Sequence, residues 1–154
     1  MLKQRTSSDP IGLYRDATSR AIEVVEAVNE DQLDWPTPCS EWTVQQLIDH
    51  LVLDALVAPG AMERVCVSPL GFDWPLAQAV GGTFMDVLIH TWDLARATGQ
   101  DERLDPELVQ ACTAMFVPEM PSRGREAGII GPEVQISSHA SAQDRLLAVM
   151  GRTP

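Results

Sequence analysis

Apolar side chains recur every three or four residues along most of this chain, which is the spacing of helices that bury one face. A first helix is predicted from about Pro10 to Asn29, because Asp9 can cap its start and proline is favoured in a first helical turn. A second helix is predicted to open at Thr43, which has the spacing of a capping box with Gln46.

Three further helices are predicted in the second half of the chain. One runs from Pro75 to about Thr98, with Asp73 as its N-cap. Another begins at the cap-and-proline pair Asp105–Pro106 and ends near Val117–Pro118. A short last helix is predicted from Ala142 to Met150, where Gly151 can end it.

The remaining segments lack helical periodicity. Residues 65–67 resemble a short strand before a turn, so we expect a strand-like hairpin near residues 65–74. Residues 119–138 contain prolines, glycines and serines, and we expect an irregular surface loop there. Since no repeat, low-complexity stretch or linker divides the chain, residues 1–154 are predicted to form one all-α helical-bundle domain.

Composition narrows the classes of function. Hydrophobic residues make up 45% of the 154 residues, which is enough to build a core. The formal net charge of −11 disfavours binding to nucleic acid or to an anionic membrane surface. No apolar run approaches the ~20 residues of a membrane span, and no signal peptide is visible at the N-terminus.

The cysteines indicate a reducing compartment. Cys39, Cys66 and Cys112 are odd in number, widely spaced and without a CxxC pair, so neither a disulfide framework nor a zinc finger is expected. Each is predicted to be a small buried hydrophobic residue. A cytoplasmic location follows as the expectation.

The helix predicted to end at Thr98 carries the candidate chemistry. Apolar side chains cover most of its circumference, so it should be buried, and one narrow sector holds Asp86, His90 and Asp93. Asp86 and His90 are four residues apart, which places a carboxylate and an imidazole on one face, where they can bind one metal ion. Gly82, one turn before Asp86, is expected to leave space for a small substrate.

A third metal ligand must come from another helix. His50 lies at the border of the apolar stripe of the second helix, from which it can point into a crevice between helices. With Asp86 and His90 it would form a three-ligand site with open positions, as in catalytic metal centres. Alternatively, the polar sector is the wet face of an amphipathic helix and His50 an ordinary half-buried histidine. His139 lies beside serines and is expected to face solvent.

Three motifs, the first of them made of two segments, resemble a known family in order along the chain. The segments PTPCSEWTV at 36–44 and LIDHL at 47–51 are similar to the N-terminal signature of the mycothiol-dependent maleylpyruvate isomerase family, and DVLIHTWDLARATGQ at 86–100 is similar to its second signature. The segment AQDRLLAVMGR at 142–152 resembles the C-terminal part of a small actinobacterial subfamily of mostly uncharacterised members. The family belongs to the DinB-like metal-binding proteins, so the resemblance implies an up-down four-helix bundle.

The resemblance also implies a site and a chemistry. The family's ligands are a histidine on the second helix and a carboxylate-x-x-x-histidine pair, which correspond to His50, Asp86 and His90. Zinc is the expected divalent ion, with nickel or iron as alternatives. A small thiol such as mycothiol is implied as cosubstrate, held by the ion as its thiolate. Asp93 then either orients a ligand from behind or is an ordinary carboxylate on the helix surface.

Two departures from the family pattern modify this picture. The isomerase has an additional C-terminal domain, whereas this chain ends at Pro154, so maleylpyruvate is not the expected substrate. Relatives also carry more chain after the His50 helix, which predicts that part of helices two and three is missing or not shown here. We expect a discontinuity or a fused helix near Val52 and Leu53. Either unseen residues or a second chain, as in a homodimer, would cover the apolar positions left open.

Two functions remain as hypotheses. The first is a metal-dependent thiol transferase or isomerase that acts on a small electrophile. The second is a non-catalytic metal-binding or vestigial bundle that acts through oligomerisation.

Overall fold

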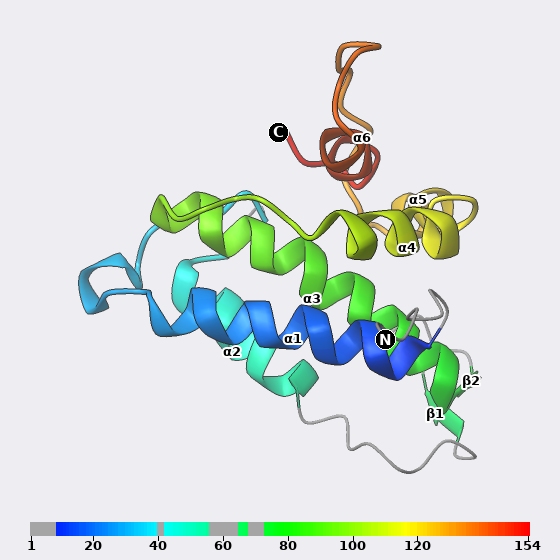
Figure 1. Ribbon diagram of the computed structural model, residues 1–154, viewed down its shortest axis with the longest axis horizontal. Coiled ribbons are helices and arrows are strands. Elements are labelled where there is room, and N and C mark those ends of the chain that lie inside the picture. The colour runs from blue at the N-terminus through cyan, green and yellow to red at the C-terminus, as the bar shows by residue number, and fades with distance from the viewer. Residues whose placement is uncertain (1–8, 40–41, 56–64, 68–72) are drawn as a thin grey trace, which may run out of the picture.

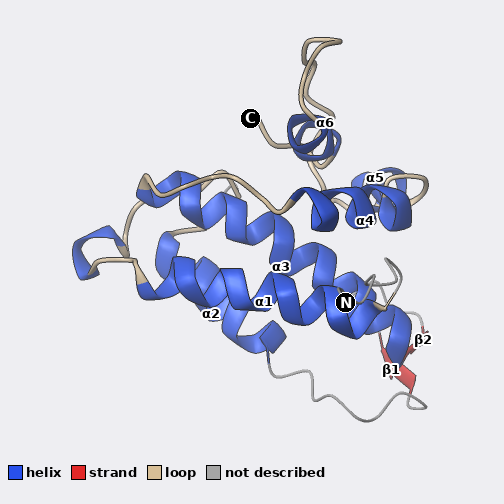
Figure 2. Ribbon diagram, viewed as in Figure 1, coloured by secondary structure: helices blue, strands red, loops and turns tan. Residues whose placement is uncertain are grey.

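The computed structural model describes residues 9–39, 42–55, 65–67 and 73–154. Within these ranges the named secondary-structure elements are helices apart from one short hairpin, which confirms the predicted all-α class (Figures 1 and 2). The elements in chain order are α1 (Pro10–Glu26), the 3-10 helix η1 (Glu30–Gln32), α2 (Val44–Ala55), β1 (Val65–Val67), β2 (Asp73–Pro75), α3 (Leu76–Thr98), α4 (Pro106–Phe116), α5 (Met120–Glu126) and α6 (Ala142–Val149).

Helix α3 is the central element of the fold. It packs along α1 and α2, while α4, α5 and α6 lie together on the other side of it (Figure 1). Because neighbours cover it on several sides, α3 needs apolar residues around most of its circumference, as its sequence predicts. Its Phe84, Trp92 and Leu94 are buried in one core with Leu47 of α2 and Leu147 of α6.

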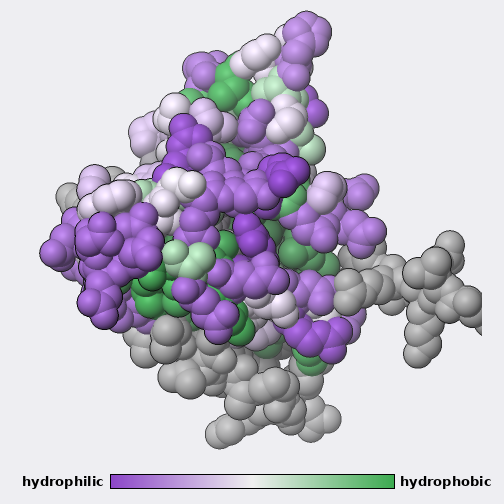
Figure 3. Space-filling model, turned by 60° about the vertical axis from the view of Figure 1, so that its left-hand side comes forward, coloured by the Kyte–Doolittle hydropathy of each residue, from purple (hydrophilic) through white to green (hydrophobic). Residues whose placement is uncertain are grey.

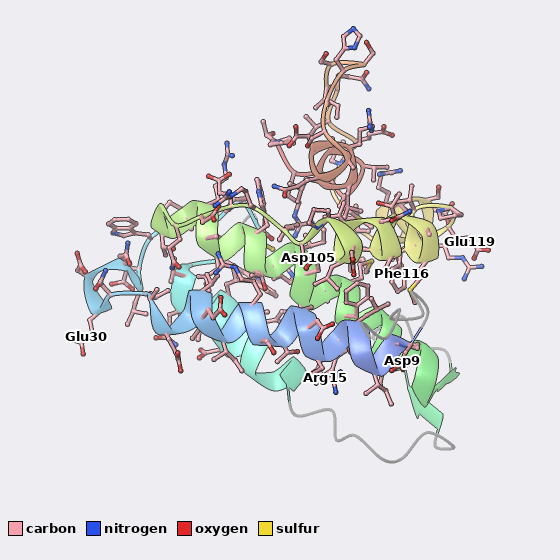
Figure 4. All side chains as sticks on the ribbon, viewed as in Figure 1. Asp9, Arg15, Glu30, Asp105, Phe116 and Glu119 are labelled. Atoms are coloured by element: carbon pink, nitrogen blue, oxygen red, sulfur yellow. The ribbon has the colours of Figure 1, made fainter. Side chains whose placement is uncertain are left out.

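Side-chain caps fix where the helices begin. Asp9 and Asp105 accept hydrogen bonds from the second backbone amide of α1 and α4, at 3.2 and 2.7 Å, and both lie at the start of their helices in Figure 4. Thr43 and Gln46 form the predicted reciprocal capping box at the start of α2. The helix starts at Pro10 and Pro106 are therefore confirmed.

The structure corrects two of the predicted boundaries. Asp73 does not occupy the N-cap position of α3: its backbone pairs with Val67 in the antiparallel hairpin of β1 and β2, and α3 begins at Leu76. Residues 119–138 are not wholly irregular, because α5 occupies Met120–Glu126. A proline is tolerated in a first helical turn, where its missing amide has no helical partner, so Pro121 does not prevent this helix.

The junction predicted near Val52 and Leu53 is helical. Helix α2 continues through both residues to Ala55, so the backbone has no break at this position. Residues 56–64, where the rest of the predicted change falls, lie outside the described residues.

Hydrophilic residues dominate the visible surface in Figure 3, with smaller apolar areas between them. Within the described part of the chain, no helix combines the length and the apolar character that a membrane crossing requires.

Candidate metal centre

The contact between α2 and α3 brings His50, Asp86 and His90 together. On α2 the buried Leu47 and Leu51 face the core, and His50 sits at the edge of this apolar stripe, beside α3. His50 Nε2 lies 2.6 Å from Asp86 Oδ2, and His90 Nε2 lies 3.4 Å from Asp86 Oδ1. One carboxylate thus lies between two imidazoles that come from different helices.

The three side chains fit the requirements of a metal site. One nitrogen or oxygen atom of each lies within 4.8 Å of the corresponding atoms of the other two. Two imidazoles and a carboxylate are a donor set that zinc commonly takes in catalytic sites, where a further position stays open. The side chains of His50 and Asp86 are 31% and 35% exposed, so the cluster is open to solvent on one side.

The polar sector of α3 is not a wet helix face. His90 is only 6% exposed and Asp93 is fully buried at 0%. The reading of Asp93 as an ordinary surface carboxylate is therefore wrong. The physical reason is that the segment after α6 covers this side of α3 and brings a cation to it.

Asp93 holds the far side of the His90 ring. His90 Nδ1 lies 3.0 Å from Asp93 Oδ2, which leaves Nε2 directed at Asp86. Histidines that bind metals commonly have their second ring nitrogen held by a carboxylate in this way. Arg152 in turn donates from Nη2 to Asp93 Oδ2 at 2.8 Å and from Nε to Asp93 Oδ1 at 3.3 Å.

The local charges set the protonation of His90. Burial lowers its pKa, but the hydrogen bonds and charges of Asp86 and Asp93 outweigh burial and raise the pKa to about 9. Burial has the opposite effect on a carboxyl group and raises the pKa of Asp93. The hydrogen bond from His90 and the charge of Arg152 outweigh burial, so that the pKa of Asp93 is lowered. Without a metal, His90 is therefore an imidazolium at neutral pH, and a metal that binds Nε2 must displace its proton.

Trp42 and Cys39 also lie beside this group of side chains. The Trp42 ring stacks on His90 at a centroid distance of 5.5 Å and meets the edge of His50 at 4.7 Å. Cys39 is only half-buried, which departs from the prediction of a buried hydrophobic residue, whereas Cys112 is buried as predicted. Burial raises the pKa of the Cys39 thiol, and the carboxylates of Asp93 and Asp86 add to this against the charge of Arg152.

Cys39, His90 and Asp93 form a second group with donor atoms within 4.8 Å. This group fits a metal less well than the first. Both oxygens of Asp93 already accept hydrogen bonds from Arg152, and the raised pKa of the Cys39 thiol favours its protonated state.

Sequence reasoning missed Arg152, Trp42 and Cys39 as neighbours of the cluster. All three lie in segments that resemble the family, but no spacing rule connects them with the histidines, since Arg152 is 59 residues from Asp93. His139 lies exposed in the segment before α6, as expected. Gly82 is itself buried, and the space for a substrate beside it stays a prediction.

Comparison with known proteins identifies the family. A family model described as "Mycothiol maleylpyruvate isomerase N-terminal domain" matches residues 14–73. Two proteins of Mycobacterium tuberculosis, "Uncharacterized protein MT0763" (strain CDC 1551 / Oshkosh) and "Uncharacterized protein Rv0738" (strain ATCC 25618 / H37Rv), are each 32% identical over 183 residues, which covers 94% of this chain and 98% of theirs. No solved structure matches significantly.

The aligned length of 183 residues exceeds the length of this chain, so these relatives contain internal residues that it lacks. The alignment otherwise spans nearly all of both proteins. This chain therefore belongs to the family of the mycothiol maleylpyruvate isomerase N-terminal domain.

Proposed function

We propose that this protein is a metal-dependent enzyme that joins a small thiol of the mycothiol type to a small electrophile, or isomerises the electrophile through such an adduct. The observation that carries the proposal is the convergence of His50, Asp86 and His90 within 4.8 Å, with one side of the cluster open to solvent. Membership of a mycothiol-associated family supports a thiol as the ligand that enters from this side.

Each residue has a defined part in this proposal. His50, Asp86 and His90 would hold a divalent cation, for which zinc is the first candidate. A bound divalent cation lowers the pKa of a coordinated thiol, so that the sulfur is present as a thiolate at neutral pH. Asp93 keeps the His90 ring oriented, and the Trp42 ring forms an apolar wall beside both imidazoles.

The proposed reaction needs only the thiol, the electrophile and a proton exchanged with solvent. The thiol loses its proton to solvent at the open side of the cluster, and the sulfur then forms a bond to the electrophilic carbon. In the transfer reaction that bond persists and the electrophile takes up a proton or releases its leaving group. In the isomerisation the same bond breaks again after the geometry of the adduct has changed.

A second candidate is a non-catalytic metal-binding bundle that associates with another copy of itself. The observation that favours it is the internal segment that the mycobacterial relatives have and this chain lacks. Metal content and thiol chemistry together separate the two candidates, because both bind metal but only the first consumes thiol.

The test begins with protein purified without added metal and loaded with zinc. We expect about one ion per chain by elemental analysis, together with zinc-dependent loss of free mycothiol when a small fluorogenic electrophile is supplied. His90→Ala should abolish both zinc binding and turnover, while His139→Ala, which changes an exposed histidine that is not part of the cluster, should alter neither. Zinc binding without thiol consumption would favour the second candidate, and a folded protein that retains no zinc would refute both.

A further inference from the structure

We propose that Arg152 is a positioning residue of the metal centre, acting through Asp93 on His90. The proposal rests on the metal-dependent function above and extends it to a residue in the segment after α6. If Arg152 acts in this way, the affinity for the metal depends on how the segment after α6 packs against α3.

The three side chains form a continuous chain of contacts. The Arg152 guanidinium binds both oxygens of Asp93, and Asp93 Oδ2 also lies 3.0 Å from His90 Nδ1. A two-point contact fixes the plane of a carboxylate as well as its distance, which a single point charge cannot do. The oxygen that receives Arg152 Nη2 is the same oxygen that holds His90, so a carboxylate released by Arg152 would also change its contact with the imidazole.

Burial makes Asp93 dependent on the cation of Arg152. Asp93 has no exposed side-chain surface, and that of Arg152 is 12% exposed. A buried carboxylate that loses its cation is strongly destabilised and must move, attract water or take up a proton. Each of these responses disturbs the hydrogen bond to His90 Nδ1, on which the direction of Nε2 depends.

The backbone around Arg152 directs the side chain toward α3. Gly151 ends α6 with φ at +81°, and the chain turns there because the Arg152 amide donates to Leu147 O at 2.9 Å. Arg152 Nη1 additionally donates to Met150 O at 2.9 Å, which holds the guanidinium against its own turn. The turn at the end of α6 thus orients the Arg152 guanidinium, which contacts the carboxylate of Asp93, 59 residues earlier in the chain.

The experiment measures zinc affinity by competition with a chromophoric chelator, in the full chain at constant pH. We expect Arg152→Gln and Asp93→Asn each to weaken zinc binding about 10- to 100-fold, the range typical for residues that orient a metal ligand. Arg152→Lys keeps a cation but loses the fork, so its affinity should lie between those of the wild type and Arg152→Gln.

A matched control removes an arginine that supports the same region without touching Asp93. Arg125 donates from Nη1 to Val149 O at 3.0 Å, at the end of α6. Arg125→Gln should therefore lower stability in urea by an amount similar to that of other lost hydrogen bonds, while zinc affinity stays within about twofold of the wild type.

A double variant distinguishes positioning from general stabilisation. If Arg152 acts through Asp93, adding Arg152→Gln to Asp93→Asn should weaken zinc binding no further, whereas independent effects would multiply. Equal zinc affinity in the wild type and in folded Arg152→Gln would overturn this inference and leave the proposed function intact. Multiplied effects in the double variant would also overturn it. Absence of zinc binding in the wild type would refute both, and zinc binding without thiol chemistry would refute the proposed reaction alone.

Discussion

At the scale of single residues, His90 joins the two parts of the site. One nitrogen faces Asp86 and His50, and the other faces the buried pair of Asp93 and Arg152. Because both carboxylates favour the imidazolium, the metal-free protein keeps a proton on His90 that a metal must displace. The same residue therefore couples pH to stability and to metal affinity, in opposite directions.

In the metal-free protein, the protonation of His90 is expected to make stability depend on pH. The pKa of His90 rises from 6.5 to about 9 on folding, so its contribution to stability is complete below pH 6.5 and is lost as pH rises through about 9. The free energy of unfolding in urea should fall over this range by up to about 3 kcal/mol. In His90→Gln the fall should be much smaller, and an equal fall in both proteins would show that another group is responsible.

At the scale of elements, the end of α6 is expected to be sensitive to a single methyl group. Gly151 has φ at +81°, and a Cβ built there would lie 3.0 Å from Cα of Gly131. Gly99 ends α3 with φ at +70° but has open space where its Cβ would be. The two glycines thus separate the cost of a left-handed conformation from that of a backbone clash.

We accordingly expect Gly151→Ala to destabilise the protein more than Gly99→Ala. The control should cost about 1 kcal/mol for conformation alone, and Gly151→Ala about 1–3 kcal/mol more for the displaced backbone. Urea unfolding of both variants measures the difference. Equal losses of unfolding free energy in the two variants would mean that the backbone at Gly131 can move away from the added methyl group at no cost.

Much of the fold and part of the site could be predicted from local sequence. The caps at Asp9 and Asp105, and the spacing of Asp86 and His90, depend on neighbours within one helical turn, and these are visible in the sequence. Burial of Asp93 could not be predicted, because it depends on Arg152, a distant residue of another segment. The prediction that Asp73 caps a helix was wrong for a similar reason. Aspartate shortly before a proline is a common helix start, but here the backbone of Asp73 pairs with Val67 in a hairpin, which local sequence does not reveal.

At the scale of the whole molecule, the formal net charge of −11 gives the protein a net negative field at a distance. Such a field attracts divalent cations and repels the protein's own acidic groups from one another. Raising the concentration of potassium chloride from low to physiological values screens this field over about 10 Å. We expect the association rate of zinc to fall as a result, and an uncharged osmolyte at matched osmolality to leave the rate unchanged. A rate that does not respond to salt would show that the local charges, rather than the overall charge, control entry.

The stacking of Trp42 on His90 has an optical consequence. An excited indole transfers an electron readily to a neighbouring imidazolium but poorly to a neutral imidazole, so Trp42 should emit weakly while His90 carries its second proton. Displacement of that proton would brighten the emission of this residue, and Trp42→Phe would remove the change while leaving the signals of the other tryptophans. The emission of Trp42 would then report the state of the cluster without any label.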